Sequence, residues 1–435
     1  MNKITKIIAC TGLAFSMAAC SNAAPKEEEK PQEGAPITGN YSYFVEGFDY
    51  GCSVTKATVT LSEAIPSISA DRLSVSETKK TTDWTDENFA EKELTFDRTV
   101  TNAYLIDDEG KETTEPSNKF VIEMSEDPNT GSPFTFSVFT GRNSWCNPYQ
   151  LTIAMDECEI DPVAVAKSTS ADNFTIDQGE FAGVTYDYAY YAPEKESDTV
   201  VVWLHGGGEG GVGAADENIN VYTALLGNKV TALAGEKFQE AVGGAHVLVP
   251  QCPTYWIDVD GKNGGEWEHA DGTSFYTESL VELIDSYVAK VGAKNVVITG
   301  CSNGGYMTMV LAKNCGDKYT SYVPICAPMD SEAISEDDLN VLKELPMYFI
   351  YSEDDDTVDP KGYEIPVLKR LEEAGAKNIS VSTSEHVTDL SGKYKDAEGK
   401  PYQYSGHWSW IYFDNNDTAD QNGVSVFDWI KSTLK

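Results

Sequence analysis

The sequence is poor in basic residues. Its 435 residues include 32 lysines and arginines against 70 aspartates and glutamates, which gives a formal net charge of -38. A surface of this kind repels phosphate backbones and anionic lipid head groups. We therefore expect no nucleic-acid partner, and any attachment to a membrane would depend on something other than charge.

Cysteine spacings typical of metal sites are also missing. Nine cysteines are present, but no C-x-x-C pair occurs among the seven that follow residue 20. A zinc or iron–sulfur site is not expected, and we predict no cofactor. An odd number of cysteines leaves at least one unpaired within a monomer, and the spacing does not show which others pair.

The N-terminal apolar run is too short to span a membrane. Residues 7–19 follow two lysines, and thirteen residues fall below the length of about 20 that a bilayer requires. We predict a signal peptide over residues 1–19. The stretch SMAAC is similar to a bacterial lipobox, although Met17 stands where leucine is usual. Cys20 would then be lipidated and would anchor the protein to the outer face of the bacterial cell membrane; an ordinary signal peptide would give a secreted protein instead.

Two regions of different pattern follow a charged, proline-containing tether over residues 20–36. Residues 37–170 lack long helical patterns and contain short apolar runs separated by turn residues, such as KATVTLS and NKFVIEMS. Such spacing predicts an all-β, antiparallel sandwich. No histidine occurs in this region, so we expect a structural role or a binding surface there.

Residues 171–435 alternate strand-like and helical patterns. The apolar runs TVVVWL, HVLVP, NVVITG, SYVPIC, MYFIY and ISVSTS are separated by helical stretches such as SLVELIDSYVAKVG. This order predicts an α/β domain with a mostly parallel sheet covered on both faces. In such sheets, reactive groups lie at the carboxyl ends of the strands.

A nucleophile candidate follows one of these strands directly. Residues 300–304 read Gly-Cys-Ser-Asn-Gly, a G-x-S-x-G motif between the run NVVIT and a helical stretch. A sharp strand-to-helix turn exposes the serine hydroxyl, and the flanking glycines remove side chains that would clash. Ser302 is therefore the predicted nucleophile; a serine in an ordinary turn is the alternative.

The general base and its carboxylate should come later in the chain, because α/β-hydrolases place Ser, Asp or Glu, and His in that order. That order excludes His205, His246 and His269. His407, in GHWSW, is favoured over His386, which follows the last predicted strand.

Three adjacent aspartates follow the run MYFIY, and they supply the candidate acid. Asp355 fits an acid position that many hydrolases of this kind share, with Asp356 in reserve, while at least one of the three should belong to a solvated turn.

A glycine-rich stretch, WLHGGGEGGVG, follows the first strand of this region. It also fits the G-x-G-x-x-G dinucleotide pattern, but no apolar helix starts at its last glycine and the next strand ends without an acid. We therefore interpret it as an oxyanion loop. The amides of Gly207 and Gly208 would act together with that of Asn303, and losing one such donor typically costs about 10²–10³ in turnover.

On these motifs the C-terminal region resembles α/β-hydrolases of the prolyl-oligopeptidase-like and polyester-depolymerase-like esterase group. The whole chain resembles bacterial extracellular esterases with an immunoglobulin-like N-terminal domain. The N-terminal region resembles them by the arrangement of its strands more than by sequence motifs. The stretches that carry the resemblance are YAYYAP, WLHGGGEGG, VLVPQCPTYW, GCSNGGYMTM, SEDDDTVDP and GHWSWIYFDNN. The resemblance implies a triad of Ser302, Asp355 and His407 and hydrolysis of carboxylic esters.

The predicted reaction is acyl transfer from an ester to water through an acyl-serine. Tyr255, Trp256 and Trp408 are candidate pocket residues, although core packing would explain them equally well. Two alternatives remain open. One is a serine peptidase of the prolyl-oligopeptidase type; the other is a catalytically inactive binding lipoprotein.

Overall fold

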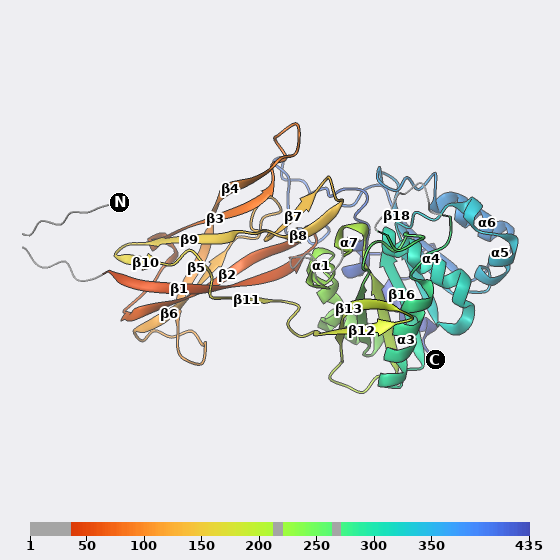
Figure 1. Ribbon diagram of the computed structural model, residues 1–435, viewed down its shortest axis with the longest axis horizontal. Helices are drawn as coiled ribbons and strands as arrows, with labels where there is room; N and C mark the ends of the chain where they lie inside the picture. Colours follow the sequence, from red (N-terminus) through yellow and green to blue (C-terminus); the bar gives the residue numbers. More distant parts are fainter. Residues whose placement is uncertain (1–35, 212–220, 263–270) are drawn as a thin grey trace, which may run out of the picture. The chain divides into compact units, whose positions relative to one another are not determined.

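The computed structural model describes residues 36–211, 221–262 and 271–435. The predicted signal peptide, Cys20 and nearly all of the predicted tether lie outside these ranges. Two large sheets account for most strands: one of nine strands drawn from β1 to β11, and one of eight strands from β12 to β19 (Figure 1). No helix in the described part of the chain is long and apolar enough to cross a membrane.

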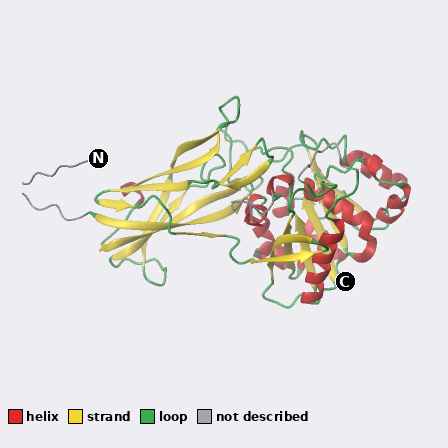
Figure 2. Cartoon of the chain, in the orientation of Figure 1, coloured by secondary structure: helices red, strands yellow, loops and turns green. Residues whose placement is uncertain are grey.

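The N-terminal region is all β, as predicted, and it contains only one short 3-10 turn (Figure 2). Its strands are β1 (Ile37–Phe48), β2 (Gly51–Ile65), β3 (Leu73–Thr82), β4 (Glu91–Arg98), β5 (Val100–Ile106), β6 (Ser117–Met124), β7 (Phe134–Ser137), β8 (Arg142–Trp145), β9 (Tyr149–Met155), β10 (Cys158–Ile160) and β11 (Ala166–Thr169).

Strand pairing in this region departs from a purely antiparallel sandwich. The order is β4-β3-β9-β10-β1-β2-β6-β5, so hydrogen bonding runs continuously through the short strand β10. Strand β1 pairs in parallel with both β10 and β11, and the other pairs are antiparallel. Val59 and Phe120 from one half of the sheet share a buried core with Val75 and Leu151 from the other. The two halves therefore enclose one core.

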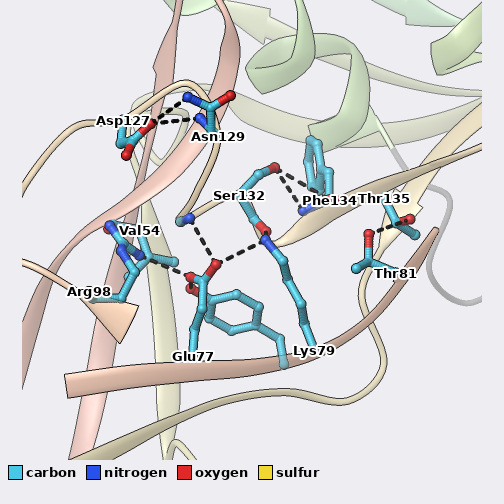
Figure 3. A network of polar contacts seen from close by, with 12 residues as sticks. Val54, Glu77, Lys79, Thr81, Arg98, Asp127, Asn129, Ser132, Phe134 and Thr135 are labelled. Carbon is cyan, nitrogen blue, oxygen red and sulfur yellow. Dashed lines mark hydrogen bonds and ion pairs between the residues drawn. The ribbon is translucent and has the colours of Figure 1, made fainter. Parts of the chain in front are cut away.

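A buried ionic network fixes the base of the β7–β8 hairpin (Figure 3). The Glu77 carboxylate contacts Arg98 and Lys79 at 3.0 Å each and accepts the backbone N–H of Gly131 at 2.9 Å. Lys79 also donates to the Ser132 carbonyl at 2.8 Å. Burial raises the pKa of Glu77, but the two cations and the amide outweigh it, and the net pKa is lowered. The segment that leads into β7 is thus tied to strands β3 and β4.

The C-terminal region has the predicted mostly parallel sheet. Its strands are β12 (Thr175–Phe181), β13 (Val184–Tyr191), β14 (Thr199–Leu204), β15 (His246–Gln251), β16 (Asn295–Cys301), β17 (Ser321–Ile325), β18 (Met347–Ser352) and β19 (Ile379–Ser384). The order is β12-β13-β15-β14-β16-β17-β18-β19, with antiparallel pairing only for β12 with β13 and for β13 with β15. All six predicted apolar runs of this region form strands.

Helices cover both faces of this sheet. They are α1 (Val221–Gly227), α2 (Glu236–Val242), α3 (Thr277–Val291), α4 (Asn303–Cys315), α5 (Glu336–Leu342), α6 (Glu364–Glu373), α7 (Trp410–Asp414) and α8 (Val426–Thr433). Side chains of β14 alternate between the two faces: Val201 and Trp203 pack with residues of α1, α2 and α8, whereas Val200 and Val202 pack with residues of α3 to α6. The sheet is therefore buried on both sides, and its strand ends are where polar groups can gather.

Candidate active site

Ser302 occupies a strained turn between β16 and α4. It is the N-cap of α4, with φ 53° and ψ -118°, in a region that non-glycine residues rarely adopt. A Cβ on Gly300 or on Gly304 would overlap the carbonyl oxygen of Leu204 on the neighbouring strand β14. Both glycines of the motif are thus required by close backbone packing, which holds the serine at the carboxyl end of the sheet.

Asp355 and His407 form a hydrogen-bonded pair in which the carboxylate is buried. The Nδ1 atom of His407 lies 2.8 Å from Oδ2 of Asp355, and their side chains are 12% and 1% exposed. The other carboxylate oxygen, Oδ1, accepts the backbone N–H groups of Thr357 and Val358 at 2.9 and 2.8 Å. The turn after β18 therefore fixes the carboxylate. Because the carboxylate bonds to Nδ1, Nε2 of His407 is available to a second partner.

His386 forms a second histidine–aspartate pair, with Asp354. Its Nδ1 lies 2.7 Å from Oδ2 of Asp354, but its side chain is 44% exposed. The hydrogen bond to Asp354 raises the pKa of His386. Asp356 is exposed. Of the three adjacent aspartates, only Asp355 is buried beside a histidine.

Ser302 and His407 line the same cavity of about 630 Å³, a volume typical of small-molecule sites. Gly206, Gly207 and Gly208 form part of its wall. Aromatic side chains from both regions of the chain also line it: Tyr50, Trp84, Phe134, Phe136, Tyr255, Trp408 and Trp410. His386 is not among the lining residues.

Two of the three candidate pocket residues, Tyr255 and Trp408, line this cavity, and Trp256 does not. Trp256 is fully buried, with its ring stacked on Tyr186 at a centroid distance of 6.4 Å. Its backbone N–H donates to Oδ1 of Asn303 at 2.6 Å. Trp256 therefore lies in the core and fixes the side chain of Asn303, the residue after Ser302.

The glycine-rich loop follows β14 and forms a short 3-10 turn over Gly207–Glu209. Neutral His205 fixes its start: Nδ1 donates to the Gly206 carbonyl at 2.7 Å, while Nε2 accepts the Cys252 N–H at 2.9 Å. Burial lowers the pKa of His205 to about 4, which keeps the ring neutral. His205 is therefore a buried structural group, which agrees with excluding it as the triad base. His269 lies outside the described residues.

Asn303 is the first residue of α4, and the first N–H groups of a helix have no intrahelical acceptor. A Cβ added to Gly207 would lie 3.9 Å from Cβ of Asn303. The loop after β14 and the start of α4 thus lie side by side at the cavity, as an oxyanion hole requires.

No pattern in the sequence indicated that the N-terminal region contacts this loop. Asn143, on β8, donates from Nδ2 to Oε1 of Glu209 at 2.9 Å. Arg142 places its guanidinium 4.1 Å from the ring centroid of Tyr255 and donates from Nε to the Tyr255 hydroxyl at 3.1 Å. Both contacts join residues more than 60 positions apart, so no local pattern could have indicated them.

One set of described residues has ligand atoms close enough to hold a metal ion. The set is Cys326, Asp355 and His407, whose ligand atoms lie within 4.8 Å of one another. However, Nδ1 of the histidine and Oδ2 of the aspartate already bond to each other. Burial, together with the Asp355 charge, raises the pKa of the Cys326 thiol well above its usual value, so it remains neutral. A neutral thiol is a poor metal ligand, so these residues fit a metal poorly. All seven cysteines in the described ranges are free thiols.

Two family descriptions match the chain. Residues 40–158 match "Esterase Ig-like N-terminal domain", and residues 188–379 match "Phospholipase/Carboxylesterase". No curated protein sequence matches the chain.

Several solved structures match most or part of the chain. A structure described as a thermostable esterase is 19% identical, with a TM-score of 0.66, and the match covers 90% of this chain and 98% of that one. A cold-adapted esterase from an Arctic intertidal metagenomic library is 17% identical (TM-score 0.33; 48% and 82% covered), and a ferulic acid esterase is 10% identical (TM-score 0.41; 60% and 98% covered). The chain therefore contains an α/β-hydrolase domain of the carboxylesterase type, and an esterase immunoglobulin-like domain precedes it in the sequence.

Proposed function

We propose that this carboxylesterase-type hydrolase is an extracytoplasmic serine esterase whose triad is Ser302, His407 and Asp355. The observation that supports the proposal is that the strained serine, the aspartate-bound histidine and the glycine loop line the same cavity. A serine hydroxyl needs a base to become a nucleophile, and that base needs a carboxylate to fix its tautomer. The export part of the proposal depends on residues 1–19 and Cys20.

The reaction proceeds by two acyl transfers. Ser302 Oγ attacks the ester carbonyl while Nε2 of His407 takes its proton, and Asp355 stabilises the imidazolium that forms. The carbonyl oxygen becomes negative and is bound by the amides of Gly207, Gly208 and Asn303. His407 then gives its proton to the departing alcohol, which leaves an acyl-serine. Water, deprotonated by the same histidine, attacks the acyl-serine and releases the acid.

The cavity favours esters with a sizeable apolar group. Tyr255, Trp408 and Trp410 contribute aromatic surface close to the catalytic residues, and burying an apolar group against such surface contributes about 25 cal/mol per Å². The negative net charge disfavours strongly anionic substrates.

The test is hydrolysis of p-nitrophenyl esters of increasing acyl length by wild type and by Ser302→Ala. We expect turnover by wild type and a loss on the order of 10⁴-fold or more in the variant. Ser302→Ala with wild-type turnover would contradict the proposed nucleophile. Proline-containing peptides cleaved faster than every ester would instead assign a peptidase.

A further inference from the structure

The oxyanion loop contacts the N-terminal domain at a buried carboxyl group. Glu209 ends the 3-10 turn of the loop and is only 5% exposed. Its Oε1 accepts a hydrogen bond from Asn143 Nδ2 at 2.9 Å, and its own carbonyl accepts one from Gln251 at 3.0 Å. The triad chemistry described above does not use this carboxyl group.

The carboxyl group lies on the serine side of the loop. A Cβ built on Gly206 would lie 3.1 Å from Oε2 of Glu209 and 3.8 Å from Cβ of Ser302, so both groups border the same small space. The next contact is equally close, because a Cβ on Gly208 would lie 2.9 Å from Nδ2 of Asn143. A side chain at either glycine would crowd the carboxyl or the amide, so the glycines let both groups lie close to the loop backbone.

We propose that Asn143 and Glu209 are positioning residues, which couple the N-terminal domain to the amides of the oxyanion loop. This inference rests on the proposed esterase function. Asn143 lies against Gly208 from the N-terminal domain. Its hydrogen bond holds the Glu209 carboxyl in one orientation, next to Gly206. The loop amides are thereby fixed before substrate arrives, which is how an oxyanion hole stabilises developing charge without reorganisation.

The hairpin that carries Asn143 is itself held firmly. Thr81 donates to the hydroxyl of Thr135 at 3.0 Å, and Thr82 donates to the Phe136 carbonyl at 2.7 Å. These bonds fix β7 to β3, beside the buried ionic network of Glu77. A rigid strand can transmit a fixed position to the loop, whereas a mobile one could not.

Glu209 also carries a charge that changes near neutral pH. Burial raises its pKa to about 7, although the hydrogen bond from Asn143 lowers it in part. Among ionisable groups, Cys301 interacts with the charge of Glu209, and Asp414 acts on Cys301 in turn. His205 lies at the start of the loop, and Arg142 precedes Asn143 on β8. Burial lowers the pKa of His205 to about 4 and raises that of the Cys301 thiol well above its usual value, so these two groups stay neutral near pH 7. Burial also raises the pKa of Asp414 well above its usual value.

The pH dependence follows from the sign of this shift. Below about pH 7 the Glu209 carboxyl is neutral, and above it the group is an anion on the serine side of the loop. An anion there opposes the negative charge that forms on the ester oxygen. Turnover by wild type should therefore fall, relative to a variant with a neutral group at this position, as the pH rises through 7.

The first experiment measures kcat and KM for a p-nitrophenyl ester in full-length Asn143→Ala. We expect kcat to fall about tenfold, the value of a typical hydrogen bond, with KM within about twofold. Asn102→Ala is the matched control, because Asn102 also donates to a glutamate, Glu123 at 3.3 Å, but from an exposed strand. Equal kcat values for Asn143→Ala and Asn102→Ala would overturn the inference.

The second experiment compares pH profiles of Glu209→Gln and wild type between pH 6 and 9. Glutamine keeps an oxygen for Asn143 but cannot ionise, so the ratio of variant to wild-type kcat should rise about tenfold across this range. Parallel profiles would overturn the titrating role. In a Glu209→Ala background, Asn143→Ala should have no further effect, because the two act as one unit; additive losses would count against the coupling.

These outcomes are separate from those for the proposed function. If wild type hydrolyses no ester, or if Ser302→Ala keeps its activity, the proposed esterase mechanism fails. If Ser302→Ala is inactive while Asn143→Ala and Glu209→Gln behave as wild type at every pH, only the coupling fails. Thermal unfolding of each variant shows whether it is folded before its kinetics are compared.

Discussion

Asp355 holds His407 through one carboxylate oxygen, 2.8 Å from Nδ1, while two backbone amides occupy the other oxygen. Asp355 is buried, whereas its neighbour Asp356 is exposed. The geometry therefore favours Asp355, which the sequence also preferred, over its reserve Asp356.

Asp355→Asn should lower kcat for ester hydrolysis by about 10⁴-fold, because the amide no longer stabilises the required tautomer and the imidazolium. Asp356→Asn is the matched control and should change kcat by less than about twofold, since that side chain faces solvent. Steady-state kinetics on a p-nitrophenyl ester checks both. Equal effects of the two substitutions would mean that Asp355 is not the triad acid.

The two histidines make an equally direct comparison. His407→Ala should reduce kcat by several orders of magnitude, because it removes the base that lines the cavity. His386→Ala should leave kcat near wild type, because His386 is exposed and bonds to Asp354 instead. Loss of turnover in His386→Ala alone would exchange their roles.

Glu77 should be critical for folding of the N-terminal domain. Glu77→Ala leaves the fully buried Arg98 without its carboxylate, and such a loss typically costs about 3–5 kcal/mol. Glu93→Ala, on the exposed side of β4, should change the free energy of unfolding by less than about 0.5 kcal/mol. Urea unfolding followed by tryptophan fluorescence measures both. Similar stabilities of the two variants would contradict the role of the network.

The same network has a predicted acid sensitivity. The pKa of Glu77 is lowered in the folded protein, so its contribution to stability is present above the ordinary carboxyl pKa and is lost as the pH falls through the folded value. Wild type should therefore lose more stability than Glu77→Gln between pH 6 and pH 3. Identical pH dependence in the two proteins would contradict this.

Glu364 should have the opposite effect on stability. It is buried at the start of α6, neither carboxylate oxygen has a partner among the described residues, and burial raises its pKa to about 8. Between the usual pKa of 4.5 and about 8, the unfolded chain is ionised and the folded one is not, so stability falls as the pH rises.

Glu364→Gln should accordingly stabilise the protein at pH 7 by about 3 kcal/mol, with no gain at pH 4. Glu372 lies on the same helix but is exposed, so Glu372→Gln should change the stability equally little at pH 7 and at pH 4. Thermal unfolding at both pH values measures the effect. A Glu364→Gln variant no more stable than wild type at pH 7 would refute the burial of an uncharged carboxyl.

Much of the hydrolase sheet was predictable because its strands are short, continuous apolar runs. The runs TVVVWL and NVVITG are buried on both faces, as a parallel sheet requires, and they form β14 and β16. Because such strands end at one edge, the motifs after β14, β16 and β18 were expected to meet. Ser302 and His407 do line one cavity, and Asp355 bonds to His407.

Other features had no local signal. Strands β3 and β4, LSVSETKKTT and EKELTFDR, are rich in charged residues, and only the burial of Glu77, Lys79 and Arg98 against one another allows them to form part of a core. The parallel pairs of β1 with β10 and β11 join segments that lie more than 100 residues apart. The sequence could not show that the two adjacent aromatic residues Tyr255 and Trp256 differ. The Tyr255 side chain enters the cavity, whereas the Trp256 side chain enters the core.

The most direct test of the account is covalent labelling of the folded protein by a fluorophosphonate, with the modified peptide located by mass spectrometry. We predict one label per chain on Ser302, none in Ser302→Ala, and strongly reduced labelling in His407→Ala. Labelling of another residue, or of none in a folded and esterase-active protein, would contradict the claim that Ser302 is the nucleophile.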